Sequence, residues 1–155
     1  MKNFWFSLFF ILLMFSYKYA YAFNNHKSNQ FELSAEIVRD ESGEYEILIS
    51  LSNTTDKDIS MYEASLPWIA YDYFIQKVVL NDRQLKLLYP VHETSREVIK
   101  FLSGETKRGK LALRSFILHE DLLKKKDMKI FWNYHLKNVN QISFGERQGV
   151  IHLKF

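Results

Sequence analysis

The feature that most constrains this chain is a two-residue alternation of apolar and polar side chains, which begins at Phe31 and recurs to the C-terminus. Apolar residues occupy every second position in four segments, 31–37, 45–51, 128–136 and 151–155. Successive side chains of a β-strand point to opposite faces of its sheet. Each segment therefore predicts a strand with one buried face.

Shorter apolar runs complete a set of seven to nine predicted strands: 59–66, 78–80, 85–89, 98–102 and 111–113. Turn-forming residues separate them, for example from Asp40 to Gly43 and from Asn81 to Arg83. Short strands spaced roughly ten residues apart, with turns between them, are typical of an all-β, two-sheet sandwich. We expect helix only in the N-terminal segment and at 119–126.

The first 22 residues, Met1 to Ala22, have the pattern of a secretory signal peptide. Lys2 supplies the positive charge, 4–15 is an apolar run, and Ala20 and Ala22 are the small residues before a cleavage site. The run is shorter than the roughly 20 residues that span a bilayer. We therefore expect cleavage, with an uncleaved membrane anchor as the alternative.

Cleavage would release a mature chain that begins at Phe23 and is periplasmic or secreted. Its residues 23–30 are polar and predict a mobile leader, and 31–155 has the size of one domain. The chain contains no cysteine, so neither a disulfide nor a lipidated thiol is available. Packing alone must stabilise the fold, and the mature protein has no predicted membrane attachment.

Charge argues against a nucleic-acid partner. The 21 Lys and Arg residues nearly balance the 18 Asp and Glu residues, and Lys2 and Lys18 would leave with the signal peptide. Lys124 to Lys126 is the only run of like charge, and acidic residues flank it. A mature domain so close to neutral lacks the broad positive field of a nucleic-acid binder.

Five short motifs follow one another along the chain: Ile49 to Asp56, Leu66 to Trp68, Asn81 to Leu85, Gly104 to Thr106 and Ile130 to Tyr134. They form a strand ending in asparagine and threonine, a proline corner, a strand pair, a Gly-Glu-Thr turn and a late aromatic strand. This order resembles the small immunoglobulin-like domain that forms the non-catalytic part of exported bacterial deuterolysin-like metallopeptidases. The resemblance covers Leu48 to Leu136 and implies an immunoglobulin-like β-sandwich.

The catalytic half of that family carries a His-Glu-x-x-His helix, whose two histidines bind zinc while the glutamate acts as base. The nearest stretch here is His119 to Leu123, where Leu123 replaces the second histidine. The sequence also lacks a Gly-x-Ser-x-Gly elbow and a cysteine nucleophile. We therefore expect a protein that is not an enzyme and needs no cofactor.

Two histidines offer an alternative metal site. His135 lies on the polar face of the 128–136 strand, and His152 lies on the corresponding face of the last strand. If these strands are neighbours, the two imidazoles would lie side by side and bind a metal. Two exposed histidines without a ligand are the competing interpretation.

The candidate partner-binding residues are Trp68, Tyr71, Asp72 and Tyr73, which follow the corner at Pro67. Aromatic rings there would either plug one end of the sandwich or form a protein-recognition hot spot, since such rings bury large areas at little entropic cost. Both roles remain open for this segment. We expect Trp132 and Tyr134 to lie in the core.

The favoured function is an exported protein-binding module that blocks another envelope protein, such as an immunity protein or inhibitor acting on a toxin or hydrolase. A structural or cell-surface component of the envelope is a related alternative. A carbohydrate- or metal-binding protein is the third, because aromatic rings near Asp72 could stack on sugars. We expect no nucleic-acid partner.

Overall fold

The structure is a computed structural model that describes residues 30–88, 96–123 and 127–154. The predicted signal peptide, 1–22, and the predicted leader up to residue 29 lie outside the described residues, as does the lysine run from Lys124 to Lys126. Within the described residues, none of the helices is both long and apolar enough to cross a membrane.

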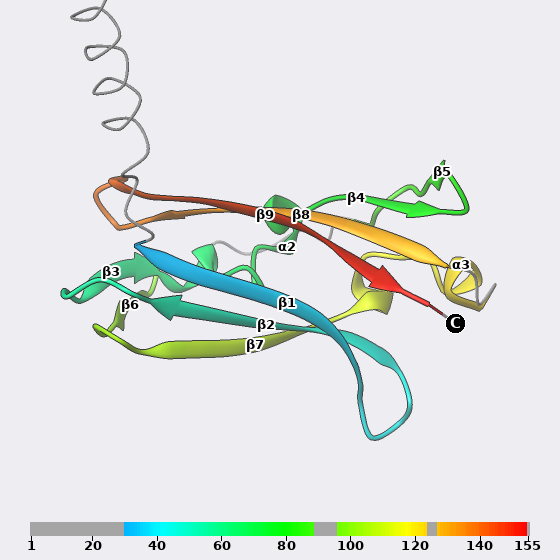
Figure 1. The fold of residues 1–155 in the computed structure, drawn as a ribbon, viewed down its shortest axis with the longest axis horizontal. Coiled ribbons are helices and arrows are strands. Elements are labelled where there is room, and N and C mark those ends of the chain that lie inside the picture. The colour runs from blue at the N-terminus through cyan, green and yellow to red at the C-terminus, as the bar shows by residue number, and fades with distance from the viewer. Residues whose placement is uncertain (1–29, 89–95, 124–126, 155) are drawn as a thin grey trace, which may run out of the picture.

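The described chain is an all-β, sandwich-like arrangement of three antiparallel sheets (Figure 1). The first sheet has the order β1-β2-β7, formed by Phe31–Arg39, Tyr45–Asn53 and Thr106–Ala112. The second has the order β5-β4-β8-β9, formed by Arg83–Gln84, Ile75–Leu80, Met128–Lys137 and Ser143–Leu153. A short third sheet pairs β3 (Ile59–Tyr62) with β6 (Val98–Phe101).

The predicted alternation is confirmed in the two central strands. Strand β2 buries Ile47, Ile49 and Leu51, and strand β8 buries every second residue from Met128 to Leu136. Trp132 and Tyr134 are core residues, as expected. Strand β1 is an edge strand, so most of its apolar side chains are only half-buried.

Several predicted strands differ from the observed elements. The strand predicted at 111–113 is the end of β7, with Leu113 already in a 3₁₀ turn, and the strand predicted to begin at Ile151 is the end of a longer strand, β9, which begins at Ser143. The strand predicted at 59–66 ends at Tyr62, and the chain then forms a 3₁₀ turn, η1 (Glu63–Ser65), closed by a hydrogen bond from Leu66 N to Glu63 O. At 85–89 the described residues form no strand, and β5 lies earlier, at Arg83–Gln84. Leu85 N still donates to Val78 O of β4, but the alternate burial of Leu85 and Leu87 lies beyond the end of β5.

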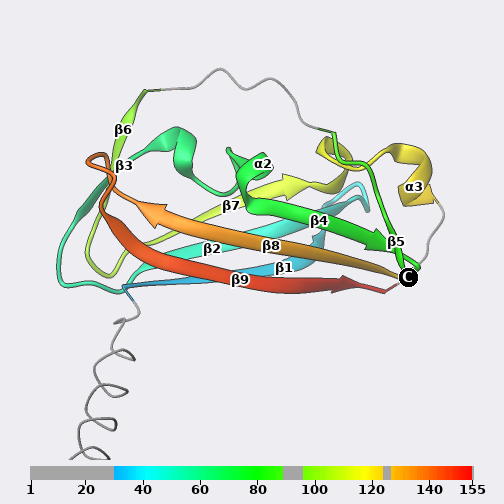
Figure 2. The same cartoon turned by 90° about the horizontal axis from the view of Figure 1, so that it is seen from above.

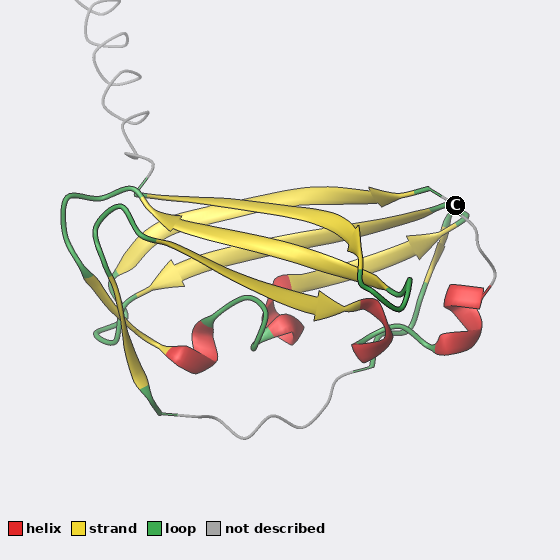
Figure 3. Ribbon diagram, turned by 90° about the horizontal axis from the view of Figure 1, so that it is seen from below, coloured by secondary structure: helices red, strands yellow, loops and turns green. Residues whose placement is uncertain are grey.

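Helical turns are more numerous than the sequence predicts. Helix α3 (His119–Leu123) lies within the predicted helical stretch, but α2 (Tyr71–Phe74) and the 3₁₀ turn η2 (Leu113–Ser115) were not expected. A single turn is too short to show helical periodicity. Figure 3 shows these helical segments along one side of the sheets, opposite the side where β1 and β9 approach each other.

Each of the two main sheets accommodates a tryptophan ring over a strand glycine. A Cβ added to Gly109 in β7 would lie 2.1 Å from Cγ of Trp68, and one added to Gly149 in β9 would lie 2.6 Å from Cζ2 of Trp132. Both distances are far below van der Waals contact. The glycines therefore provide the space that the indole rings occupy.

A buried amide connects the end of β2 to its neighbours at one end of the molecule. Asn53, which is 1% exposed, donates through Nδ2 to the carbonyl oxygens of Lys57, Phe101 and Leu102, at 2.8–3.1 Å. Its Oδ1 accepts hydrogen bonds from the backbone N and Oγ1 of Thr55. The end of β2 is thus joined to the following turn and to the end of β6.

The tryptophan–glycine contact predicts that Gly109→Val destabilises the domain. A branched side chain would overlap the Trp68 ring, and overpacking of this kind costs about 1–3 kcal/mol. Chemical denaturation measures the loss. The matched control is Arg108→Val, the neighbouring position on the exposed face of β7, and equal stability of the two variants would contradict the packing.

The amide network predicts that Asn53→Ala also destabilises the domain. The variant leaves buried carbonyl groups without their donor, at a cost of about 1–3 kcal/mol for each unsatisfied group. Thermal unfolding, compared with the exposed control Asn140→Ala, measures the effect. A melting temperature equal to that of the control would show that water replaces the amide.

Candidate binding site

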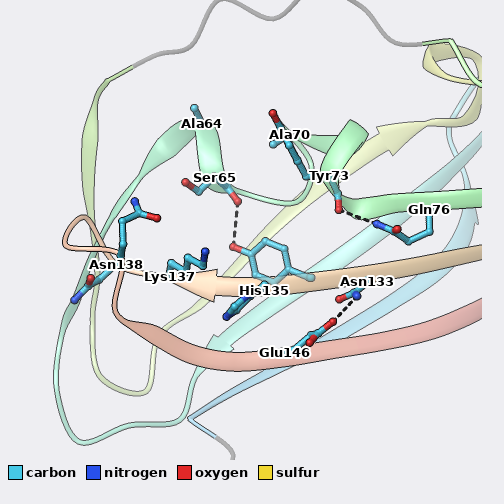
Figure 4. A pocket seen from close by; sticks show the side chains of 12 residues that line it. Ala64, Ser65, Ala70, Tyr73, Gln76, Asn133, His135, Lys137, Asn138 and Glu146 are labelled. Atoms are coloured by element: carbon cyan, nitrogen blue, oxygen red, sulfur yellow. Dashed lines mark hydrogen bonds between the residues drawn. The ribbon is translucent and has the colours of Figure 1, made fainter.

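A groove of about 580 Å³ lies between the segment that connects β3 to β4, residues 63–74, and the C-terminal part of β8 (Figure 4). We call this segment the crossover and the cavity the crossover groove. The residues contributed by the crossover and the start of β4 are Ala64, Ser65, Ala70, Tyr73 and Gln76. Those contributed by β8, β9 and their connecting turn are Asn133, Tyr134, His135, Lys137, Asn138, Gln141 and Glu146.

Only one of the four predicted binding residues lines this groove. Tyr73 is 78% exposed and stands on the outer side of α2. Trp68 is half-buried against Gly109. Asp72 is half-buried, and its Oδ1 has no hydrogen-bond partner among the described residues.

Tyr71 is a core residue, which corresponds to the plugging role, one of the two roles left open for this segment. It is 5% exposed, its hydroxyl donates to Ser115 O at 3.0 Å, and its ring lies 5.9 Å from that of Phe116. Burial, reinforced by the neighbouring Asp72 carboxylate, raises the pKa of Tyr71. In the single turn of α2, Tyr71 and Phe74 share the inward side, so Tyr73 points outward.

The floor of the groove is attached to the crossover by Tyr134. Its buried hydroxyl donates to Ser65 O at 3.1 Å, and burial raises the pKa of Tyr134 far above its usual value. On the other side of α2, Gln76 Nε2 donates to Tyr73 O at 3.2 Å. The Tyr134 bond holds η1 at the rim of the groove, and the Gln76 bond is local to the end of α2.

Two side-chain pairs line the sheet side of the groove or border it. His135 Nε2 and Ser143 Oγ lie 2.6 Å apart. Asn133 Nδ2 donates to Glu146 Oε1 (Figure 4). A serine beside a histidine is the start of a nucleophile–base pair. A catalytic histidine also needs a carboxylate to orient it. The nearby carboxylate of Glu146 accepts a hydrogen bond from Asn133 instead, so we assign no catalytic step to this pair.

The proposed pairing of His135 with His152 does not occur. In the β8–β9 register His135 lies opposite Glu146, whereas His152 lies opposite Lys129. The two histidines are thus six positions apart along the sheet, or about 20 Å at the usual rise per residue. They cannot bind the same metal ion.

The sequence did not reveal the crossover groove or the His135–Ser143 contact. Both depend on the register of β8 and β9, which shifts between Leu136 and Lys137, and on a turn in which Gln141 has φ 63°. The register shift cannot be predicted from the sequence of a short polar turn. The exposed histidine in the 128–136 alternation was the only available signal.

Comparison of the chain with protein-family models, with curated proteins and with solved structures found no match in any of the three. The resemblance to the immunoglobulin-like domain of deuterolysin-like metallopeptidases stays a prediction from the motifs.

The attachment of the groove floor predicts the effect of Tyr134→Phe. Removal of the hydroxyl leaves the carbonyl of Ser65 without its donor and should lower the free energy of unfolding by about 0.5–1.5 kcal/mol. Denaturant unfolding measures the change, and amide hydrogen exchange at residues 63–66 should accelerate more than exchange in β2. Unchanged exchange in η1 would contradict the attachment.

Proposed function

We propose that this chain is an exported, non-enzymatic protein-binding module whose recognition site is the crossover groove. The observation that carries the proposal is the position of Tyr73, an aromatic ring that is 78% exposed at a concave site. Tyrosine is enriched at interface hot spots because its rigid ring buries a large area and its hydroxyl accepts or donates a hydrogen bond.

The surroundings of Tyr73 support this role. Asn133, Glu146 and His135 provide hydrogen-bonding groups on the sheet side, and the small side chains of Ala64 and Ala70 leave the opposite wall open. An aromatic anchor surrounded by polar groups matches the general anatomy of a protein interface, in which a polar rim surrounds a few dominant contacts.

The strand orders support an immunoglobulin-like fold. The immunoglobulin sandwich places strands A, B, E and D in one sheet and strands C, F and G in the other. Assigning β1, β2 and β7 to A, B and E, and β4, β8 and β9 to C, F and G, reproduces the neighbour orders of these strands. The strand in the place of D, β6, pairs with β3 here rather than with β7. Strand β5 then extends the second sheet beside C, as C′ does in variable-type domains.

The proposed partner is a toxin or hydrolase in the cell envelope, which the protein blocks as an inhibitor or immunity protein. The signal-peptide pattern of residues 1–22 supports export to the periplasm or beyond. A neutral, cysteine-free domain that acts by occupying a surface suits this location. The alternative, a structural or cell-surface role in the envelope, requires export as well.

A second candidate function, carbohydrate binding, is favoured by the lining of the groove. Gln76, Asn133, Asn138 and Gln141 contribute amides that both donate and accept hydrogen bonds, which suits hydroxyl-rich ligands, and the ring of Tyr73 is available for stacking. Retention of the exported protein on immobilised glycans would support this function over protein binding.

Replacement of Tyr73 tests the protein-binding proposal. The exported protein should retain one dominant partner from the envelope fraction of its own or competing cells, and Tyr73→Ala should weaken capture about tenfold or more, as for a hot-spot aromatic residue. Quantitative mass spectrometry of the retained proteins, followed by titration with the purified partner, measures the change.

The matched control is Val150→Ala, a truncation of an exposed side chain on β9 that does not line the groove. Both variants should stay within about 0.5 kcal/mol of the parent protein in unfolding free energy, because both positions are at the surface. Equal capture by Tyr73→Ala and Val150→Ala would refute the assignment of the groove.

A further inference from the structure

On the side of β8 opposite β9, strand pairing stops before the strand reaches the groove. Strand β4 lies beside β8 (Figure 2) and pairs with it from Met128 to Trp132. The pairing ends at Ile75, after a register irregularity between Lys77 and Ile75. A bulge of this kind commonly terminates pairing. The next backbone hydrogen bond from another strand comes beyond the end of β8, where Val139 N donates to Ser60 O of β3 at 2.9 Å.

Residues 133–137 therefore form an unpaired stretch of sheet edge between β4 and β3. They pair with β9 on one side. On the other side, no backbone hydrogen bond reaches them from any part of the chain that the structure describes. In an antiparallel strand alternate residues direct both N–H and C=O to the same side, so this edge presents a regular row of donors and acceptors.

The crossover lies beside this edge without pairing to it. Its bond to the edge residues comes through a side chain, from the Tyr134 hydroxyl to Ser65 O. The space between the two is the crossover groove of about 580 Å³. The volume lies within the range of about 300–1,000 Å³ that is usual for binding sites.

We propose that the groove receives an extended segment of the partner protein, which pairs with residues 133–137 of β8 as an added β-strand. This inference rests on the proposed function and specifies its contact. Five strand residues span about 17 Å, so four to six residues of the partner fill the edge. Strand addition satisfies the backbone groups of both chains, while side-chain contacts select the partner.

The residues around the groove indicate which side chains the partner segment carries. Lys137 is exposed and forms no ion pair among the described residues, so an acidic side chain is favoured at that end. Tyr73 lines the opposite wall and provides a ring for an apolar side chain. The segment is therefore an extended strand that carries both an acidic and an apolar residue.

The probe is a displayed library of random nine-residue peptides, selected on the exported protein and counter-selected on Tyr73→Ala. The best peptide is then synthesised in a series with one backbone nitrogen methylated at a time, which removes one donor and leaves the protein unchanged. Methylation at alternate positions should weaken binding about tenfold, and methylation between them should have little effect.

A groove-filling variant provides an independent measurement. Ala64→Trp should abolish peptide binding, whereas Val150→Trp, outside the groove, should retain it. Circular dichroism confirms that each variant is folded. Because the methylation series uses the parent protein, its result stands even where Ala64→Trp does not fold.

The outcomes separate the two proposals. Peptides that depend on Tyr73 but tolerate methylation at every position, or bind Ala64→Trp with unchanged affinity, overturn strand addition and leave the proposed function standing. A selection that returns no Tyr73-dependent peptide counts against the proposed function itself, and strand addition fails with it.

Discussion

The contact between Trp68 and Gly109 determines where the rest of the crossover lies. The indole ring packs against β7 at a position where any side chain would overlap it, so the residue that follows the Pro67 corner is held against the first sheet. From that point the chain turns into α2, where Phe74 stacks on Trp132 of the second sheet, with ring centroids 5.4 Å apart. The crossover therefore spans the open side of the sandwich and closes it with aromatic rings.

The same anchoring separates the two sides of the crossover. Its inner side, with Tyr71 and Phe74, belongs to the core, while its outer side presents Tyr73 to solvent. Strand β4 begins only after α2, so among the described residues no strand pairs with the last part of β8 on the side opposite β9. The groove and the unpaired edge thus follow from one cause, which is that the crossover fills the interior before β4 joins the sheet.

Much of the fold could be predicted from the sequence, because half-buried strands impose a period of two. The alternation at 128–136 identified β8 and its core residues Trp132 and Tyr134, and the turn at Asn81 and Asp82 was found where both residues adopt positive φ. Among the four candidate binding residues, Tyr73 lies on the surface and Tyr71 does not. The segment 68–74 carries too short a helix for its periodicity to separate inward from outward side chains.

The sequence alone determined the all-β class, the main strand positions and the pattern of a signal peptide, because these depend on the local spacing of apolar and charged residues. Tertiary structure decided which aromatic residues are buried, that His135 and His152 are far apart, and that no described strand pairs with residues 133–137 of β8 on the side opposite β9. These features depend on strand register and on which elements are neighbours. Both result from packing between residues that are distant in the sequence. The local spacing of residues gives no information about that packing.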